Sequence, residues 1–253
     1  MLAKCGVATF PRMHTLRVLG TLDLTSPDPA AAKALLAKTT PTALLIFLAV
    51  EGLGRFVRRD RLVGLFWPET GQEQARANLR KLLHVIRTAC GDELIETRGD
   101  EEIRLAPGLI SCDVVDFARA VRGGSFVRAL ELYEGPFLVG FHVSGAPAFA
   151  QWADGIRMQT ARDAAKAAVA LAESHLVASE RTAATDLVRT IQRVAPDLDD
   201  ERLIQKLLMI LERAGDKAGA LRLYESFARR LGRDYSTTPS GETRAIIERI
   251  RLA

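Results

Sequence analysis

One amphipathic stretch, Gln72 to Gly91, constrains this chain more than any other feature of its sequence. At about 100° of rotation per residue, its apolar residues fall on one arc, which predicts a helix that packs on a small core. The arc consists of Ala75, Leu79, Leu82, Leu83, Ile86 and Cys90. The adjoining flank is basic and consists of Arg76, Arg80, His84 and Arg87, with Lys81 just beyond them. Such a helix can offer cations to a phosphate backbone, although a solvated basic surface explains the same pattern.

The segments on either side of this stretch decide between the two interpretations. A helix is predicted from Thr40-Pro41, with the threonine as cap and the proline at the first helical position, to about Gly52. A short second helix is predicted over Asp60–Trp67. After the amphipathic stretch, Leu94–Leu105 flanks the polar turn Arg98–Asp100 and predicts a β-hairpin. This order of elements is typical of a winged helix-turn-helix, so we favour DNA binding over a solvated surface.

Positive charge gathers around the same helices. The whole chain has a formal net charge of +4. Residues 55–90 contain eight lysines and arginines against three acidic residues, which leaves the rest of the chain close to neutral. A basic patch on a near-neutral background is the electrostatic footprint of a protein that binds a polyanion.

The remaining segments indicate a short β-element before the helices and a helical region after the hairpin. Alternation over Thr15–Thr25 predicts a half-buried strand or hairpin arm. Ser26–Thr39 is ambiguous between turn and helix. Helices are predicted over residues 113–121, 125–134, 146–178, 181–195, 199–214, 217–231 and 239–252. Residues 129–134 resemble residues 220–225, which either a tetratricopeptide-like array or ordinary core packing explains.

Several classes of protein are disfavoured by what the sequence contains. Its three cysteines have no paired spacing, which indicates a reducing cytoplasm. The longest apolar run, Ala43–Val50, is far shorter than the ~20 residues that span a membrane. We expect residues 1–12 to be a disordered arm and not a signal peptide, or Met13 to be the true start. The histidines are scattered without metal-ligand spacing, so we expect no catalytic residue, metal site or cofactor.

Further short runs along the chain occur together in a known family. In the first part they are Arg59–Leu62, Phe66–Glu69, Ala75–Arg80 and Ile86-Arg87. In the second part they are Asp113–Phe117, Leu132–Phe141, Trp152 and Pro239–Thr243. With these residues the chain resembles the Streptomyces antibiotic regulatory protein (SARP) family from about Leu16 to its C-terminus. The Leu-Tyr-Glu-Gly-Pro-Phe-Leu run, joined to a winged helix, is the most specific part of the resemblance.

This resemblance implies a mainly α protein with two domains. A winged helix-turn-helix with a small β-sheet and wing is expected over residues 13–108, and an all-α, tetratricopeptide-like bacterial transcriptional activator domain over residues 109–253. The family's function would make the chain a cytoplasmic transcription activator that binds direct repeats in double-stranded DNA. It would bind as a homodimer or in tandem, and contact RNA polymerase.

Eight residues are predicted to contact DNA. Arg76 and Arg80 lie one turn apart, and each can give a bidentate contact to guanine in the major groove. Arg87, further along the helix, is expected to contact phosphate or to be structural. Arg59 and Arg61 would position the DNA backbone at the start of the second helix. The full set is Arg59, Arg61, Arg76, Arg80, Lys81, His84, Arg87 and Arg98, and for each of them solvated surface is the alternative.

The sequence departs from the family pattern at two places. Arg58 stands where members place serine or threonine, and it cannot accept a capping hydrogen bond. The wing tip carries Asp100, Glu101 and Glu102 beside Arg98, and these acids would repel phosphate. We therefore expect the amphipathic helix to carry most of the specificity. The alternative function is a helical-repeat adaptor whose winged helix docks protein.

Overall fold

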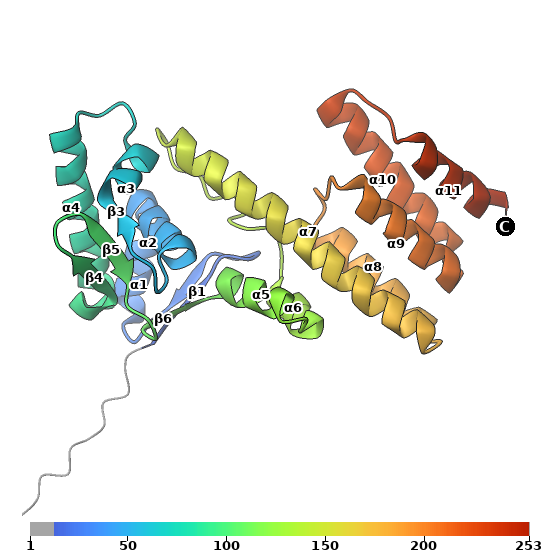
Figure 1. Ribbon diagram of the computed structural model, residues 1–253, viewed down its shortest axis with the longest axis horizontal. Helices are drawn as coiled ribbons and strands as arrows, with labels where there is room; N and C mark the ends of the chain where they lie inside the picture. Colours follow the sequence, from blue (N-terminus) through green and yellow to red (C-terminus); the bar gives the residue numbers. More distant parts are fainter. Residues whose placement is uncertain (1–12, 253) are drawn as a thin grey trace, which may run out of the picture. The chain divides into compact units, whose positions relative to one another are not determined.

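The computed structural model describes residues 13–252, which form two compact units (Figure 1). The first unit contains residues 13–18, 22–115 and 140–152. The second unit contains residues 19–21, 116–139 and 153–252. Helices predominate, and the named strands all lie in the first unit. The mainly α fold predicted from the sequence is therefore confirmed, while the predicted arm 1–12 lies outside the described residues.

A three-stranded sheet opens the first unit. Its strands are β1 (His14–Arg17), β2 (Asp23–Thr25) and β6 (Ile110–Cys112), in the order β2-β1-β6. β1 pairs antiparallel with β2 and parallel with β6. Leu16 lies opposite Leu24 in this ladder and both are buried, as the alternation in the sequence predicts. The third strand, β6, is not predicted by the sequence pattern.

α1 (Pro29–Leu36) occupies the segment whose sequence is ambiguous between turn and helix. The carboxylate of Asp28 accepts a hydrogen bond from the backbone N–H of Ala31 at 2.9 Å, and Pro29 stands in the first turn. Ala32 and Leu35 are buried. The cap, the proline and the buried side chains together favour the helix.

α2 (Thr39–Glu51) is the core helix of the first unit, and most of its residues are buried. The helix begins two residues earlier than predicted, with Lys38 at the capping position and no side-chain capping hydrogen bond. The prediction of Thr40 as the cap is therefore wrong. Pro41 still fits, because the backbone N–H groups of the first turn have no partner within a helix.

α3 (Arg59–Phe66) and α4 (Gln72–Cys90) complete the helix-turn-helix, and α4 packs against α1, α2 and α3. The apolar arc predicted for α4 is buried except at Leu82, which is half-buried. Burial raises the pKa of the Cys90 thiol to about 11, so this thiol is protonated at neutral pH and packs as a small apolar group. Arg58 precedes α3 and makes no side-chain capping hydrogen bond, as predicted.

The wing follows α4 after a short 3-10 helix, η1 (Asp92–Leu94). β3 (Val57–Arg58), β4 (Ile95–Arg98) and β5 (Glu102–Leu105) form a sheet in the order β3-β5-β4. β4 and β5 are the predicted hairpin. Gly99 turns between them with φ +58°, a left-handed conformation that glycine adopts without strain. The winged helix-turn-helix architecture is confirmed.

The start of α7 (Pro147–Val177) joins the first unit through a cluster of aromatic rings. Phe149 is buried, and its ring centroid lies 5.5 Å from that of Phe66 and 5.3 Å from that of Trp152. Trp152 lies edge-on to Phe47, with 4.9 Å between the ring centroids. Because Phe47 and Phe66 belong to α2 and α3, this distant segment of the chain completes the core beneath the helix-turn-helix.

Among the described residues of the second unit, every named secondary-structure element is a helix. Together with most of α7, these helices are α5 (Asp113–Arg122), α6 (Phe126–Leu132), α8 (Arg181–Val194), α9 (Glu201–Ala214), α10 (Lys217–Tyr235) and α11 (Gly241–Leu252). α9 packs against α8, α10 and α11 (Figure 1). The predicted tetratricopeptide-like helical domain is confirmed, with shifts at the helix ends.

The two similar six-residue segments of this unit are only partly equivalent in the fold. Ala129 and Ala220 occupy corresponding positions and are both fully buried. The tyrosines differ, because Tyr133 is buried and Tyr224 is half-buried. The similarity therefore reflects close helix packing at the alanines and not two identical repeats.

Gly20 and Gly135 approach each other too closely for either to carry a side chain. A Cβ on Gly135 would lie 2.9 Å from the Cα of Gly20, and Gly20 has φ +86°. The N–H of Gly20 donates a hydrogen bond to the carbonyl oxygen of Pro136 at 3.0 Å. The Glu-Gly-Pro run thus holds residues 19–21 within the second unit, which gives a structural reason for this part of the family pattern.

The Pro239–Thr243 run starts α11. The hydroxyl of Ser240 accepts a hydrogen bond from the backbone N–H of Thr243 at 3.3 Å, so Ser240 caps this helix, which begins two residues later than predicted. Glu201 of α9 accepts hydrogen bonds from the backbone N–H of Ser240 at 2.7 Å and from the hydroxyl of Thr243 at 2.6 Å. The run therefore fastens α11 to α9.

Glu201→Gln is expected to lower the free energy of unfolding by about 1 kcal/mol at pH 7 and to have no effect near pH 3. Burial raises the pKa of Glu201, but hydrogen bonds from Thr243 and Ser240 lower it, and the net pKa is below its ordinary value. A carboxyl group of this kind stabilises the fold above its unfolded pKa and loses that effect as the pH falls through the folded pKa. Urea denaturation followed by circular dichroism measures both values. An equal loss at both pH values would contradict the prediction.

Candidate nucleic-acid interface

The basic flank of α4 lies beside α3 and the wing. Arg80, Lys81 and His84 are exposed, whereas Arg76 and Arg87 are half-buried. The buried arc on the other side of the helix fixes the direction in which these side chains leave it. The flank is therefore presented by a rigid element and not by a loop.

Four of the arginines predicted to contact DNA line one cleft, with a volume of about 510 Å³. Arg59 is the first residue of α3, and Arg76, Arg80 and Arg87 lie along one side of α4. Asp100 lines the cleft from the turn of the wing, and leucines of α4 complete it. The structure thus brings together residues that are far apart in the sequence.

The pKa of Arg59 reflects the burial and the charges that surround it in the cleft. Burial lowers the pKa of Arg59, and the positive charges of Arg87, Arg76 and Arg80 lower it further, while Asp100 acts in the opposite direction. The net pKa is below its ordinary value, and burial is the largest cause. An anion that enters this cleft meets several guanidinium groups at once, and such groups suit phosphate or carboxylate oxygens.

Arg76 is held by an ion pair. Its Nη2 lies 2.8 Å from Oδ1 of Asp60 and 3.7 Å from Oε2 of Glu101. The hydrogen bond to Asp60 raises the pKa of Arg76, and the charges of both acids add to this. The sequence pattern did not predict this pairing. A base contact by Arg76 requires its guanidinium to leave Asp60 or to share it.

Two predicted residues lie outside the cleft and interact elsewhere. Arg61 pairs with Glu51 at 3.2 Å, and Arg98 pairs with Glu102. The guanidinium of Arg98 also lies 4.4 Å from the ring centroid of Phe56. Their side chains stay 55% and 64% exposed, respectively, so these pairs leave both groups accessible.

Sequence reasoning missed Phe56 and Arg104. The guanidinium of Arg104 lies 4.5 Å from the ring centroid of Phe56, so this ring faces two arginines of the wing hairpin. Arg104 also pairs with Glu96 across the hairpin at 2.6 Å. Phe56 precedes a strand of only two residues, and no periodicity marks it. An aromatic residue close to arginines in the sequence was the only available signal.

His84 lines a separate groove of about 310 Å³ between α1 and α4, together with Lys38, Leu35 and Val85. Its walls are mainly apolar residues of the two helices. Lys81 is exposed and lines neither this groove nor the arginine cleft. The structure thus separates these two predicted residues from the four arginines.

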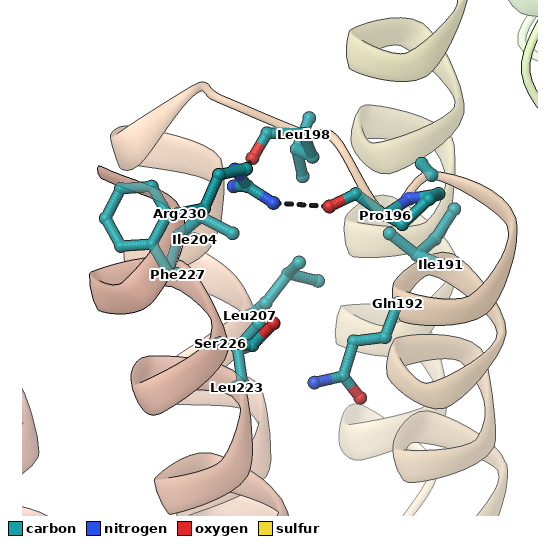
Figure 2. A pocket seen from close by; sticks show the side chains of 11 residues that line it. Ile191, Gln192, Pro196, Leu198, Ile204, Leu207, Leu223, Ser226, Phe227 and Arg230 are labelled. Atoms are coloured by element: carbon teal, nitrogen blue, oxygen red, sulfur yellow. Dashed lines mark hydrogen bonds between the residues drawn. The ribbon is translucent and has the colours of Figure 1, made fainter. Parts of the chain in front are cut away.

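A small cavity of about 80 Å³ lies in the second unit among α8, α9 and α10 (Figure 2). Apolar side chains line most of it, and Arg230 of α10 stands at one end. The guanidinium of Arg230 donates hydrogen bonds to the carbonyl oxygens of Pro196 and Leu198, and it lies 5.5 Å from the ring centroid of Phe227. Burial lowers the pKa of Arg230, although nearby acids oppose this. Arg230 therefore fastens the loop between α8 and α9 to α10.

Arg230→Ala is expected to lower the free energy of unfolding of the second unit by about 1–3 kcal/mol, because two carbonyl groups lose a charged donor. The neighbouring Arg229 is exposed, so Arg229→Ala is a matched control with little expected effect. Thermal unfolding followed by far-ultraviolet circular dichroism compares the two variants. Equal midpoints for both would contradict the role given to Arg230.

The fold and the cleft define a class of protein, a winged helix-turn-helix joined to a tetratricopeptide-like helical domain. Residues 113–251 match the family model of the bacterial transcriptional activator domain. This match covers more than half of the chain, and the chain belongs to that family. The resemblance to SARP-type regulators is thereby confirmed, and the family is one of transcriptional activators.

One solved structure extends the comparison to nearly the whole chain. The fold is similar to that of Mycobacterium tuberculosis EmbR in complex with a low-affinity phosphopeptide, with a TM-score of 0.61 and 20% sequence identity. The similarity covers 95% of this chain and 65% of the EmbR chain, so this chain spans just under two thirds of that structure. At this identity the likeness is one of fold. No curated protein matches the chain.

Residues 13–252 also bear on two other kinds of site. No group of three or more histidine, cysteine, aspartate or glutamate side chains in this range is arranged to hold a metal ion. No single helix in the same range has the length and apolar character needed to cross a membrane. Only α1 and α2 taken together have that length and composition, and the two helices are bent by 105° relative to each other.

Proposed function

We propose that the protein is a sequence-specific transcription activator whose α4 enters the major groove of double-stranded DNA. The observation that carries the proposal is the gathering of four arginines from α3 and α4 in one cleft beside the exposed flank of α4. In helix-turn-helix proteins the second helix of the motif reads base edges, while neighbouring groups contact phosphates. Membership of a transcriptional activator family supports the regulatory role.

The predicted residues divide into base readers and phosphate contacts. Arg80 is exposed on the flank of α4 and is the first candidate for a bidentate contact with guanine. Arg76 is the second, once its guanidinium leaves or shares Asp60. Arg59 and Arg87, which are half-buried in the cleft, would contact phosphate. The accessory contacts to bases or phosphates would come from Arg61, Lys81, His84 and Arg98.

Each of the two parts of the chain would bind a different partner. The winged helix would bind promoter direct repeats in the cytoplasm, as a homodimer or as copies in tandem. The helical domain would contact RNA polymerase, and the match over residues 113–251 supports its role in activation. The proposed function uses no cofactor and no catalytic residue.

Selection of binding sites from random double-stranded DNA with the full chain tests the proposal. We expect one motif to be enriched, with two copies at a fixed spacing if the sites are direct repeats. A variant with Arg76, Arg80 and Lys81 all replaced by alanine should enrich no motif. Failure of the natural chain to enrich any motif would overturn the proposal. If a partner protein also bound the triple variant with undiminished affinity, the adaptor function would replace the proposed DNA-binding function.

A further inference from the structure

Two acidic residues of the wing lie beside the arginine cleft. Asp100 lines the cleft, and Oε2 of Glu101 lies 3.7 Å from Nη2 of Arg76. Both acids are exposed and stand in the turn between β4 and β5. The carboxylates therefore supply negative charge to a site that is otherwise lined by arginines and leucines.

The position of this turn is set by the backbone. The N–H of Arg59 donates a hydrogen bond to the carbonyl oxygen of Glu101 at 2.8 Å, which joins the start of α3 to the turn. Gly99 supplies the left-handed residue that the turn needs. Glu102, the next acid, instead pairs with Arg98 outside the cleft. Asp100 thus lines the cleft and Glu101 approaches one of its arginines, whereas Glu102 does neither.

Hydrogen bonding at the cleft is incomplete. The Nε atoms of Arg59 and Arg76 are buried, and neither has a hydrogen-bond partner. A guanidinium group presents its N–H donors in a planar fork that fits the oxygens of a phosphate. The acids of the turn offset the charge of the arginines, but they accept no hydrogen bond from the Nε–H groups of Arg59 and Arg76.

We infer that Arg59, Arg76 and Arg87 of the cleft bind a phosphate of the DNA backbone, and that Asp100 and Glu101 compete with this phosphate. This assigns Arg76 to the phosphate and leaves Arg80 as the base reader. The inference rests on the proposed function, since the phosphate is one of the bound duplex. The acidic turn keeps the arginine charges partly neutralised while DNA is absent and weakens the binding of any duplex. Because a phosphate contact carries no sequence information, the turn weakens specific and non-specific binding by the same factor.

Neutral variants of the turn test the competition in the full chain. Asp100→Asn combined with Glu101→Gln should tighten binding about threefold to tenfold, both to a selected site and to an unrelated duplex. The ratio of the two affinities should stay constant. Glu96→Gln is the matched control, because Glu96 lies in the same hairpin and pairs with Arg104 outside the cleft. Unchanged affinity in the double variant, or an equal gain in the control, would overturn the inference.

Titration with inorganic phosphate separates this inference from the proposed function, because it needs no DNA. The Nε–H signals of Arg59 and Arg76 in nuclear magnetic resonance spectra report on the cleft. The double variant should shift these signals at a phosphate concentration about threefold to tenfold lower than the natural chain requires. Equal phosphate affinity in the two proteins would contradict the inference, whatever DNA binding shows. If phosphate behaves as expected but no DNA binds, the proposed function fails and the anion site stands.

Discussion

Phe149→Ala is expected to lower the free energy of unfolding of the first unit by about 3–5 kcal/mol, the largest stability effect that we predict. Phe149 lies far along the chain from the helix-turn-helix, yet its ring is buried against Phe66 and Trp152. Removing the ring leaves a cavity beneath α2 and α3. Both tryptophans of the chain, Trp67 and Trp152, belong to the first unit, so urea denaturation followed by tryptophan fluorescence reports on this core.

Phe141→Ala is the control for this experiment. Phe141 is half-buried at the edge of the same cluster, 6.4 Å from Phe149 between ring centroids, so we expect a smaller loss. A loss of less than about 1 kcal/mol for Phe149→Ala would mean that residues 140–152 do not complete the core.

We also expect a fragment of residues 13–108 to fold poorly, because it lacks both β6 and Phe149. A stable 13–108 fragment would favour the domain boundary predicted from the sequence.

Arg80→Ala is expected to weaken binding to a selected DNA site by about 1–3 kcal/mol and to relax the preference for one base pair. Arg80 is exposed on the flank of α4, and no ion pair of the kind that holds Arg76 is described for it. Fluorescence anisotropy with the selected site and with single-base variants of it measures both effects. Arg222→Ala, an exposed arginine of α10, is the control and should bind like the natural chain. Unchanged affinity and base preference would remove Arg80 from the base readers.

The elements that sequence reasoning predicted best are those with local signals. The apolar arc of α4 repeats at helical spacing, and the wing hairpin has a polar turn between two apolar pairs, so each pattern determines its element. The missing cap at Arg58 also follows from the residue itself. The prediction of Thr40 as the cap failed because α2 begins at Thr39 with Lys38 at the capping position, where no side-chain hydrogen bond marks the start of the helix.

The parts that could not be predicted depend on contacts between distant residues. β6 is three residues long and pairs with a strand nearly a hundred positions earlier, so no local pattern reveals it. The ion pair of Arg76 with Asp60 joins two helices across a turn. The candidate site was predicted as eight cations, and only the fold separates the four that share a cleft from those that pair elsewhere. The acids of the wing were predicted to repel phosphate, whereas their place beside the arginines depends on the hairpin geometry.

The most direct test of the account is the affinity of the full chain for its selected site and for an unrelated duplex of equal length, measured at several salt concentrations. We expect the chain to bind the selected site at least about 10³-fold more tightly than the unrelated duplex. We also expect the logarithm of each affinity to fall linearly as the logarithm of the salt concentration rises, because arginines and lysines displace counterions from phosphates. Equal affinity for both duplexes, or binding that does not respond to salt, would contradict a sequence-specific function for α4 and its arginine cleft.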